Sequence, residues 1–107
     1  MSKRSERAIV EVFAALSDST RLSLISKLNA RSQSATSLAE GETVTRQAIA
    51  KHLQVLESAG LVIHEKHGRE VLYSLELQRL EHAKAFLENA SANWDGAIAR
   101  LRKMVEE

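Results

Sequence analysis

The segment Thr45–Val62 combines a regular apolar stripe with a cluster of long polar side chains. Thr45 is of a type that caps helix N-termini, and Ile49, Leu53 and Leu56 then follow the spacing of one helix face. The early turns of this helix carry side chains that can hydrogen-bond to base edges or phosphates, namely Arg46, Gln47, Lys51 and His52. A helix of this kind suits the major groove of DNA, where Thr45 would add a contact to a base or phosphate.

A basic hairpin is predicted directly after this helix. Gly60 is expected to end the helix, and alternating residues then predict strands at Val62–Lys66 and Glu70–Leu75, joined by a turn at His67-Gly68. Lys66 and Arg69 flank the turn and would meet the DNA backbone or the minor groove. A helical bundle has no need of such a hairpin, so its presence favours DNA binding by a helix and a wing.

The preceding residues predict the elements that position this reading helix. A first helix is indicated by the spacing of Ile9, Val12, Phe13 and Leu16. Ser17-Asp18-Ser19 should cap a second helix whose buried face is formed by Leu22, Ile25 and Leu28. After a polar turn at Asn29–Gln33, a short third helix, Ala35–Glu40, should direct Leu38 and Ala39 inward. Ser34 and Thr36, near its start, are placed to donate hydrogen bonds to phosphate.

A long last helix is predicted from Leu77 almost to the end of the sequence. A heptad seam runs along it through Leu80, Leu87, Trp94 and Leu101, with Ala83, Ala90, Ala97 and Met104 at the companion positions. Such a narrow seam indicates packing against another long helix. The sequence therefore predicts a homodimer interface formed by this seam together with Ile9, Val12 and Phe13 of the first helix.

Size and composition predict one small, mainly α-helical domain spanning residues 1–107. The hydrophobic fraction of 44% with only 4% aromatic residues requires a core of packed aliphatic side chains. The absence of cysteine excludes disulfides, thiolate metal sites and cysteine nucleophiles. No apolar run reaches membrane-spanning length and the first residues are too charged for a signal peptide, so no membrane association and a cytoplasmic location are expected.

Charge supports DNA binding only weakly, since the net charge is +1. Between residues 42 and 75, the cations Arg46, Lys51, Lys66 and Arg69 are matched in number by Glu42, Glu57, Glu65 and Glu70. This balance keeps open a second hypothesis, in which the winged segment is a helical interaction module that docks a protein partner. Steep salt dependence of DNA binding would separate the two hypotheses, because it marks phosphate contacts.

The histidines and polar side chains do not form a metal or catalytic pattern. The last helix has only His82, and the wing histidines, His64 and His67, lack further partners, so no metal or other cofactor is predicted. Ser17, Asp18 and His52 have the residue types of a catalytic triad, but each already has a cap or helix role, and no enzymatic activity is predicted. His52 has two open interpretations, a half-buried histidine bonded to backbone or a DNA contact.

The segments LSDSTRLSLISKL and TSLAEGETVTRQAIAKHLQVLESAGLV, followed by the hairpin ending in LYSL, resemble the ArsR-type winged helix-turn-helix repressors, in the branch without metal-ligand cysteines. The similarity extends from about Phe13 to the end. It implies a homodimeric bacterial repressor joined through its first and last helices, with Thr45–Ala59 in the major groove and Lys66–Arg69 as the wing. Such a dimer would bind an inverted-repeat operator. Two alternatives stay open, namely repression of its own gene and regulation by a small-molecule or protein effector. Ser19 and Gln47 replace prolines that are common in the family, a conservative change at helix starts.

Overall fold

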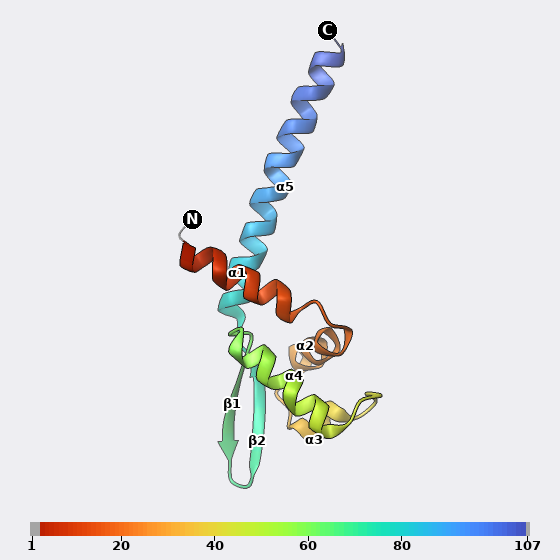
Figure 1. Cartoon of the computed structure of the whole chain (residues 1–107), viewed down its shortest axis with the longest axis vertical. Coiled ribbons are helices and arrows are strands. Elements are labelled where there is room, and N and C mark those ends of the chain that lie inside the picture. The colour runs from red at the N-terminus through yellow and green to blue at the C-terminus, as the bar shows by residue number, and fades with distance from the viewer. Residues whose placement is uncertain (1–2, 107) are drawn as a thin grey trace.

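A computed structural model describes residues 3–106, with the backbone only for Ser5 (Figure 1). The elements are α1 (Lys3–Ala15), α2 (Ser19–Ala30), α3 (Ala35–Ala39), α4 (Arg46–Ser58), β1 (Val62–His67), β2 (Glu70–Leu75) and α5 (Leu77–Glu106). This confirms the predicted fold class, a mainly helical chain with a two-stranded wing and a long last helix.

The core lies where α1, α2, α3, α4 and the base of the hairpin meet. Its fully buried large side chains are aliphatic: Val12, Leu24, Leu38, Ile49, Leu53, Leu56, Leu61 and Val62. The predicted inward face of α4 is therefore confirmed, because each member of its stripe is in this set.

The predicted buried face of α2 is partly wrong. Leu24 and Leu28 face the core, Ile25 packs at its edge, and Leu22 is 51% exposed. Leucine or isoleucine occurs at several registers of this helix, so its sequence offers two apolar faces. Contacts with α4 and β2 select the face that carries Leu24, and local spacing does not report those contacts.

Short polar side chains begin three of the helices. Asp18 caps α2 by accepting a hydrogen bond from the Arg21 backbone N–H at 3.0 Å. Ser34 and Thr45 do the same for α3 and α4, accepting from the N–H groups of Ser37 and Ala48 at 3.2 and 3.1 Å. Such caps satisfy donors that the first helical turn leaves unpaired.

Helix α4 ends at Ser58, and Gly60 stops its continuation, as predicted. Gly60 has a φ of +78°, its N–H donates to the Glu57 carbonyl at 2.9 Å, and the Leu61 N–H donates to the Leu56 carbonyl at 3.0 Å. This pair of bonds is a Schellman motif, which needs a left-handed residue after the helix and therefore favours glycine. The motif fixes the angle at which the chain leaves α4 and enters the wing.

The wing is an antiparallel hairpin with Val62 opposite Leu75 and His67 opposite Glu70. Its two-residue loop is Gly68-Arg69, one position later than the predicted His67-Gly68 turn. Gly68 has a φ of +66° and no other loop residue has a positive φ, the pattern of a type II′ turn. The strand alternation did not fix this register, because most residues near the tip are exposed on both faces.

The turn between α2 and α3 also pairs with the wing. Gln33 and Tyr73 exchange two backbone hydrogen bonds, of 3.1 and 2.8 Å, so that Gln33 adds a short third strand position beside β2. The buried Gln33 side chain donates to the Lys27 carbonyl at 2.9 Å and accepts from the Ser37 hydroxyl at 2.8 Å. Gln33 therefore joins α2, α3 and β2.

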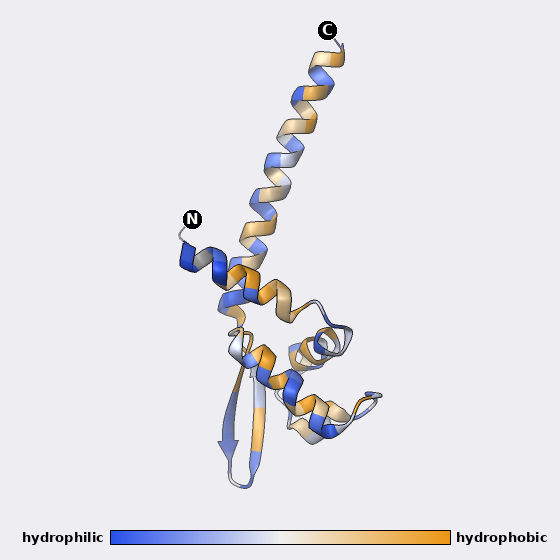
Figure 2. Ribbon diagram, in the orientation of Figure 1, coloured by the Kyte–Doolittle hydropathy of each residue, from blue (hydrophilic) through white to orange (hydrophobic). Residues whose placement is uncertain are grey.

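Helix α5 has two different halves. Its first turns pack under α1 through the buried Ala83 and through Phe86, whose ring lies 6.3 Å from that of Phe13. The rest projects as a rod, which gives the molecule extents of 68 × 30 × 20 Å (Figure 1). Hydrophobic positions continue along this projecting half (Figure 2), where Trp94 is 67% and Leu101 is 61% exposed.

Candidate nucleic-acid interface

Helix α4 presents a polar face to solvent on the side opposite its buried stripe. Arg46, Gln47, Lys51 and Gln54 are all exposed on this face, together with the cap residue Thr45. Gln54 was missed in the sequence analysis, although its spacing of seven residues from Gln47 places it on the same side of the helix. The N-terminal half of α4 thus presents several hydrogen-bonding side chains to solvent, with the exposed Ala50 among them.

A shallow depression lies between α3 and the start of α4. It is lined by Ala35, Thr45, Arg46, Gln47 and Ala50. The two alanines leave space beside the longer polar side chains, so that a flat group such as a base edge or its methyl can approach the α4 backbone.

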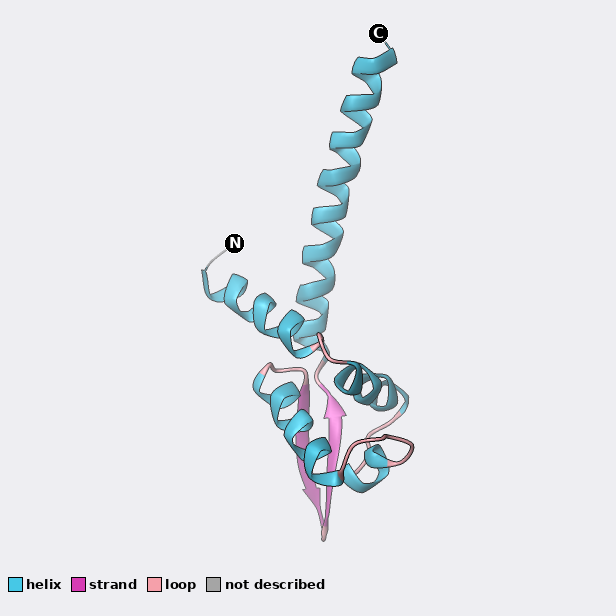
Figure 3. Ribbon diagram, turned by 45° about the vertical axis from the view of Figure 1, so that its right-hand side comes forward, coloured by secondary structure: helices cyan, strands magenta, loops and turns pink. Residues whose placement is uncertain are grey.

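The hairpin extends the same end of the molecule. The tip of the wing and the N-terminal end of α4 both point away from the free end of α5 (Figures 1 and 3). Lys66 and Arg69 are exposed beside this tip. We use the name reading surface for Thr45, Arg46, Gln47, Lys51, Lys66 and Arg69.

A partly buried ion pair holds the turn between α3 and α4. The Lys27 ammonium donates to Glu42 Oε2 at 2.7 Å and to the carbonyls of Leu38 and Glu40 at 2.9 and 2.7 Å. The Ser23 hydroxyl donates to the same carboxylate at 2.8 Å. Hydrogen bonds from Lys27 and then Ser23 hold the pKa of Glu42 below its ordinary value of 4.5. This network fixes α3 relative to α4 from the α2 side.

Three of the four glutamates in the winged segment have side-chain partners outside the reading surface. Glu42 binds Lys27, Glu57 contacts Nδ1 of His64, and Glu65 lies 3.2 Å from Nε2 of His67. Among residues 3–106, no carboxylate lies within ion-pair distance of the four cations of the reading surface, Arg46, Lys51, Lys66 and Arg69. The cations and glutamates of this segment are therefore equal in number in the sequence, but they are not paired with one another in the structure.

His52 is held from within the domain. Its side chain is 20% exposed, with Nδ1 3.8 Å from Asp18 Oδ2 and accepting a hydrogen bond from the Arg21 guanidinium at 3.2 Å. It is half-buried, as one of the two interpretations expected, but its partners are side chains and not backbone groups. The hydrogen bond from the Arg21 backbone N–H, together with the charge of the Arg21 guanidinium, holds the pKa of Asp18 below its ordinary value of 3.8. A DNA contact by His52 stays a prediction.

The other predicted phosphate ligands lie at the edge of the reading surface. The Ser34 hydroxyl is already the acceptor that caps α3, which leaves its own proton free to donate. Thr36 is exposed on α3. Both assignments remain predictions.

The predicted dimer residues divide into two groups. Val12 is 1% exposed and belongs to the core of the single chain, while Ile9, Phe13 and Leu80 are half-buried between α1 and α5. Leu87, Trp94 and Leu101 are exposed along α5. The second group has the surface that an interface requires, whereas Val12 acts only by holding α1 in place.

Within residues 3–106, no three histidine, aspartate or glutamate side chains are grouped so that they could hold a metal ion. In the same part of the chain, none of the helices combines the length and the apolar character that spanning a membrane would require.

Comparison with known proteins identifies the family. Residues 16–65 match the model of a helix-turn-helix domain. An ArsR-like transcriptional regulator from Rhodococcus sp. RHA1 superimposes with a TM-score of 0.81 at 41% identity, over 92% of this chain and 93% of that one. The regulator YuzN of Bacillus subtilis is 42% identical over 54% of this chain and 71% of its own length.

The repressor SmtB of Mycobacterium tuberculosis is 32% identical over 67% of this chain. The match spans 53% of the length of SmtB, so the chain corresponds to about half of that relative. The chain belongs to the ArsR-type family of winged helix-turn-helix transcriptional regulators.

Proposed function

We propose that the protein is a homodimeric, sequence-specific DNA-binding repressor that acts on an inverted-repeat operator in the bacterial cytoplasm. The observation that carries the proposal is the reading surface, in which an exposed polar helix face and a basic wing tip lie at one end of the molecule. Four cations on this surface have no carboxylate partner among the described residues. Phosphates are the natural counterions for such an arrangement.

The same observation weakens the protein-docking alternative. That hypothesis depended on four glutamates offsetting four cations in the winged segment. Three of these glutamates, Glu42, Glu57 and Glu65, are engaged by Lys27, His64 and His67. One of these pairs, Glu42 with Lys27, matches a glutamate with a cation from outside the counted segment, so the segment together with Lys27 presents more positive charge to a partner than its own composition suggests.

Each side chain has a role that follows from its chemistry. Arg46 would bind the O6 and N7 atoms of guanine, and Gln47 would bind N6 and N7 of adenine. Lys51 would reach a base edge or a phosphate, with Thr45 and His52 adding contacts beside it. On the flanks, Lys66 and Arg69 would meet backbone or minor groove, and Ser34 and Thr36 would donate to phosphate.

The dimer is supported by the projecting half of α5. A free helical segment of this length is marginal in water, and Gly96 lowers its stability by about 1 kcal/mol relative to alanine. Trp94, Leu101 and Met104 nonetheless remain exposed along it. Packing against α5 of a second copy would bury these side chains and relate the two reading surfaces by a two-fold axis. Half-sites about 34 Å apart would then lie in successive major grooves.

Selection of bound fragments from the source genome tests the proposal. The purified protein should enrich a short inverted repeat, and its affinity for that operator should fall steeply between 50 and 200 mM salt, as counterion release requires, by roughly tenfold or more. A scrambled duplex of the same length is the control. Absence of enrichment, together with salt-independent binding, would favour docking of a protein partner instead.

A further inference from the structure

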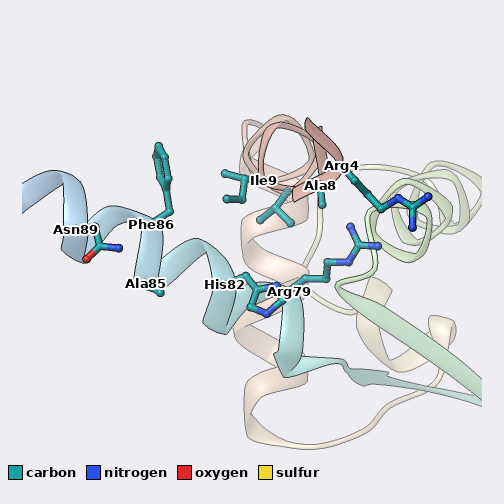
Figure 4. A pocket seen from close by; sticks show the side chains of 9 residues that line it. Arg4, Ala8, Ile9, Arg79, His82, Ala85, Phe86 and Asn89 are labelled. Carbon is teal, nitrogen blue, oxygen red and sulfur yellow. The ribbon is translucent and has the colours of Figure 1, made fainter. Parts of the chain in front are cut away.

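A second recessed site lies outside the reading surface and shares no residue with it. It is a pocket of about 410 Å³ between α1 and the first turns of α5 (Figure 4). Pockets for small ligands in proteins span about 300–1,000 Å³, so the volume suits a compact organic molecule. Nothing in the proposed DNA contacts uses this pocket.

The pocket is positively charged at one end. Arg4 of α1 and Arg79 of α5 both line it, and their guanidinium groups extend toward the same end (Figure 4). Among residues 3–106, neither guanidinium has a carboxylate within ion-pair distance. Two like charges at one end of a pocket, with no carboxylate partner among the described residues, favour the binding of an anion.

The rest of the pocket has a different character. Ile9 on α1 and Phe86 on α5 supply apolar walls, and His82 and Asn89 add polar groups along α5. An apolar body can therefore lie against Ile9 and Phe86 while its anionic group reaches the arginines. Inorganic phosphate would use only one of these two parts.

We propose that this pocket binds a small organic anion, a carboxylate or phosphate ester with a compact apolar body, and that the bound anion changes the affinity for DNA. The binding step does not depend on the DNA contacts proposed above, and Ile9 belongs both to this pocket and to the predicted dimer interface. The effect on DNA rests on that function.

Arg79 connects the pocket with the reading helix. Its side chain lies directly over Gly60, since a Cβ atom added to Gly60 would be 3.0 Å from both Cγ and Nε of Arg79. Gly60 is the left-handed residue that ends α4. An anion that binds the Arg79 guanidinium would therefore act on a side chain that packs against Gly60. Gly60 sets the angle between α4 and β1.

A second connection runs through the end of α1. The Arg21 side chain donates to the carbonyls of Ala15 and Ala14 and to Nδ1 of His52 on α4. Movement of α1 over the pocket is thereby transmitted to α4 by a side chain that contacts both helices. Coupling between two such sites is reciprocal, so the operator must change the affinity for the anion by the same factor.

Benzoate is a suitable probe because it combines a carboxylate with a compact ring. Titrated into the DNA-free protein, it should produce saturable NMR shifts at Ala8, Ile9, Ala85 and Phe86. Benzamide, which has the same shape without the charge, and inorganic phosphate, which has charge without the ring, should bind at least about tenfold more weakly. Arg4→Gln and Arg79→Gln should each weaken benzoate about tenfold. Arg100→Gln, an exposed arginine farther along α5, is the matched control and should leave binding unchanged.

Three results would overturn the binding proposal. The first is equal binding of benzoate by the Arg79→Gln and Arg100→Gln variants, and the second is the absence of any saturable shift. The third is a set of pocket shifts that depends on protein concentration and not on benzoate, which would mean that a second copy of the chain fills the groove.

The effect on DNA is measured separately, by operator titration with and without saturating benzoate. A change in affinity of about fivefold or more is expected, and Arg79→Gln should abolish the change without abolishing DNA binding. If bound benzoate left the affinity for the operator unchanged, the regulatory step would be disproved. The proposal that the pocket binds an anion would still stand. Failure to bind any operator would instead disprove the proposed function, while the NMR titration would still report on the pocket.

Discussion

The winged domain and the projecting half of α5 use apolar residues in opposite ways. In the winged domain, Leu53, Leu56 and Leu61 are fully buried by other parts of the same chain. Along distal α5, Trp94, Leu101 and Met104 have no such cover within residues 3–106. The difference indicates that the first region folds on its own contacts, whereas the second depends on contacts from outside the chain. Substitution of leucines in the two regions should therefore have different consequences.

The largest effect is expected in the winged core. Leu53→Ala removes a side chain that is 1% exposed, so it should lower the free energy of unfolding by about 2–5 kcal/mol through lost burial and a cavity. Urea unfolding followed by circular dichroism measures this loss, which should not depend on protein concentration. Leu101→Ala is the matched control, and its effect should vary with protein concentration because it acts through association. If the loss of stability depended on protein concentration in the same way for both variants, the proposed difference between the two regions would be wrong.

Charged substitutions in the seam should break the dimer and preserve the domain. Leu87→Glu and Trp94→Glu each place a carboxylate in the proposed interface, where burial of the native side chains contributes several kcal/mol at about 25 cal/mol per Å². Sedimentation at micromolar concentration should show a dimer for the native protein and a monomer for either variant. The monomers should retain the circular dichroism of the winged domain. A native protein that sediments as a monomer would rule out this interface.

Within the reading surface, the helix and the wing should differ in specificity. Gln47→Ala and Arg46→Ala should each weaken operator binding by about 1–3 kcal/mol and reduce discrimination against a scrambled duplex. Arg69→Ala should weaken binding to both duplexes by similar factors and flatten the salt slope by about one unit. Paired salt titrations on the two duplexes distinguish these outcomes. Equal behaviour of Gln47→Ala and Arg69→Ala would show that helix and wing do not divide the work in this way.

A smaller effect is expected at the turn between α3 and α4. Glu42→Gln removes a charged partner of Lys27 and should lower stability at pH 7 by about 1 kcal/mol. Because the pKa of Glu42 is lowered below 4.5 in the folded chain, its contribution is present above pH 4.5 and is lost as the pH falls through the lowered pKa. The difference between native and variant unfolding curves should therefore shrink below pH 4.5. The control is Glu70→Gln, at an exposed position. An equal loss of stability in that variant would show that the pairing of Glu42 with Lys27 does not stabilise the fold.

The smallest expected effect is that of metal ions. Stoichiometric zinc or cadmium should leave operator affinity unchanged, and a chelator should not alter binding. The chain has no cysteine, and within residues 3–106 no histidine belongs to a group of three potential metal ligands. A tenfold loss of affinity on adding zinc would reveal a site that involves His64, His67 or His82. Operator titration in metal-free buffer provides the comparison.

Local signals predicted most of the fold, because its main elements begin and end at residues with strong local preferences. Thr45 caps α4, Gly60 ends it, and the α4 stripe is buried as its spacing indicated. The features that were missed depend on contacts between distant residues. Gln33 meets Tyr73 from 40 positions away, a pairing that no periodicity in either segment reveals.

The candidate site was predicted in its residue types but not in its electrostatics. Counting charges along the chain made the winged segment neutral, because a count cannot show which carboxylate binds which cation. The structure assigns Glu42 to Lys27, a residue of α2 that lies outside the counted segment. The pocket beside Arg79 could not be predicted from the sequence either. Arg4 and Arg79 are far apart along the chain and line the same pocket only in the folded protein.

The wing is mechanically a cantilever that is clamped at one end only. Backbone bonds between Gln33 and Tyr73, and from Glu76 to Leu61, fix its base, and beyond Val62 every residue of β1 is exposed. The displacement of such a beam is greatest at its tip, where Lys66 and Arg69 lie. The wing can thus follow a groove that narrows or widens from one sequence to another, while α4 keeps its place on the rigid core. Cross-linking the tip to the domain would stiffen the beam, and the range of DNA shapes accepted beside the operator would then narrow.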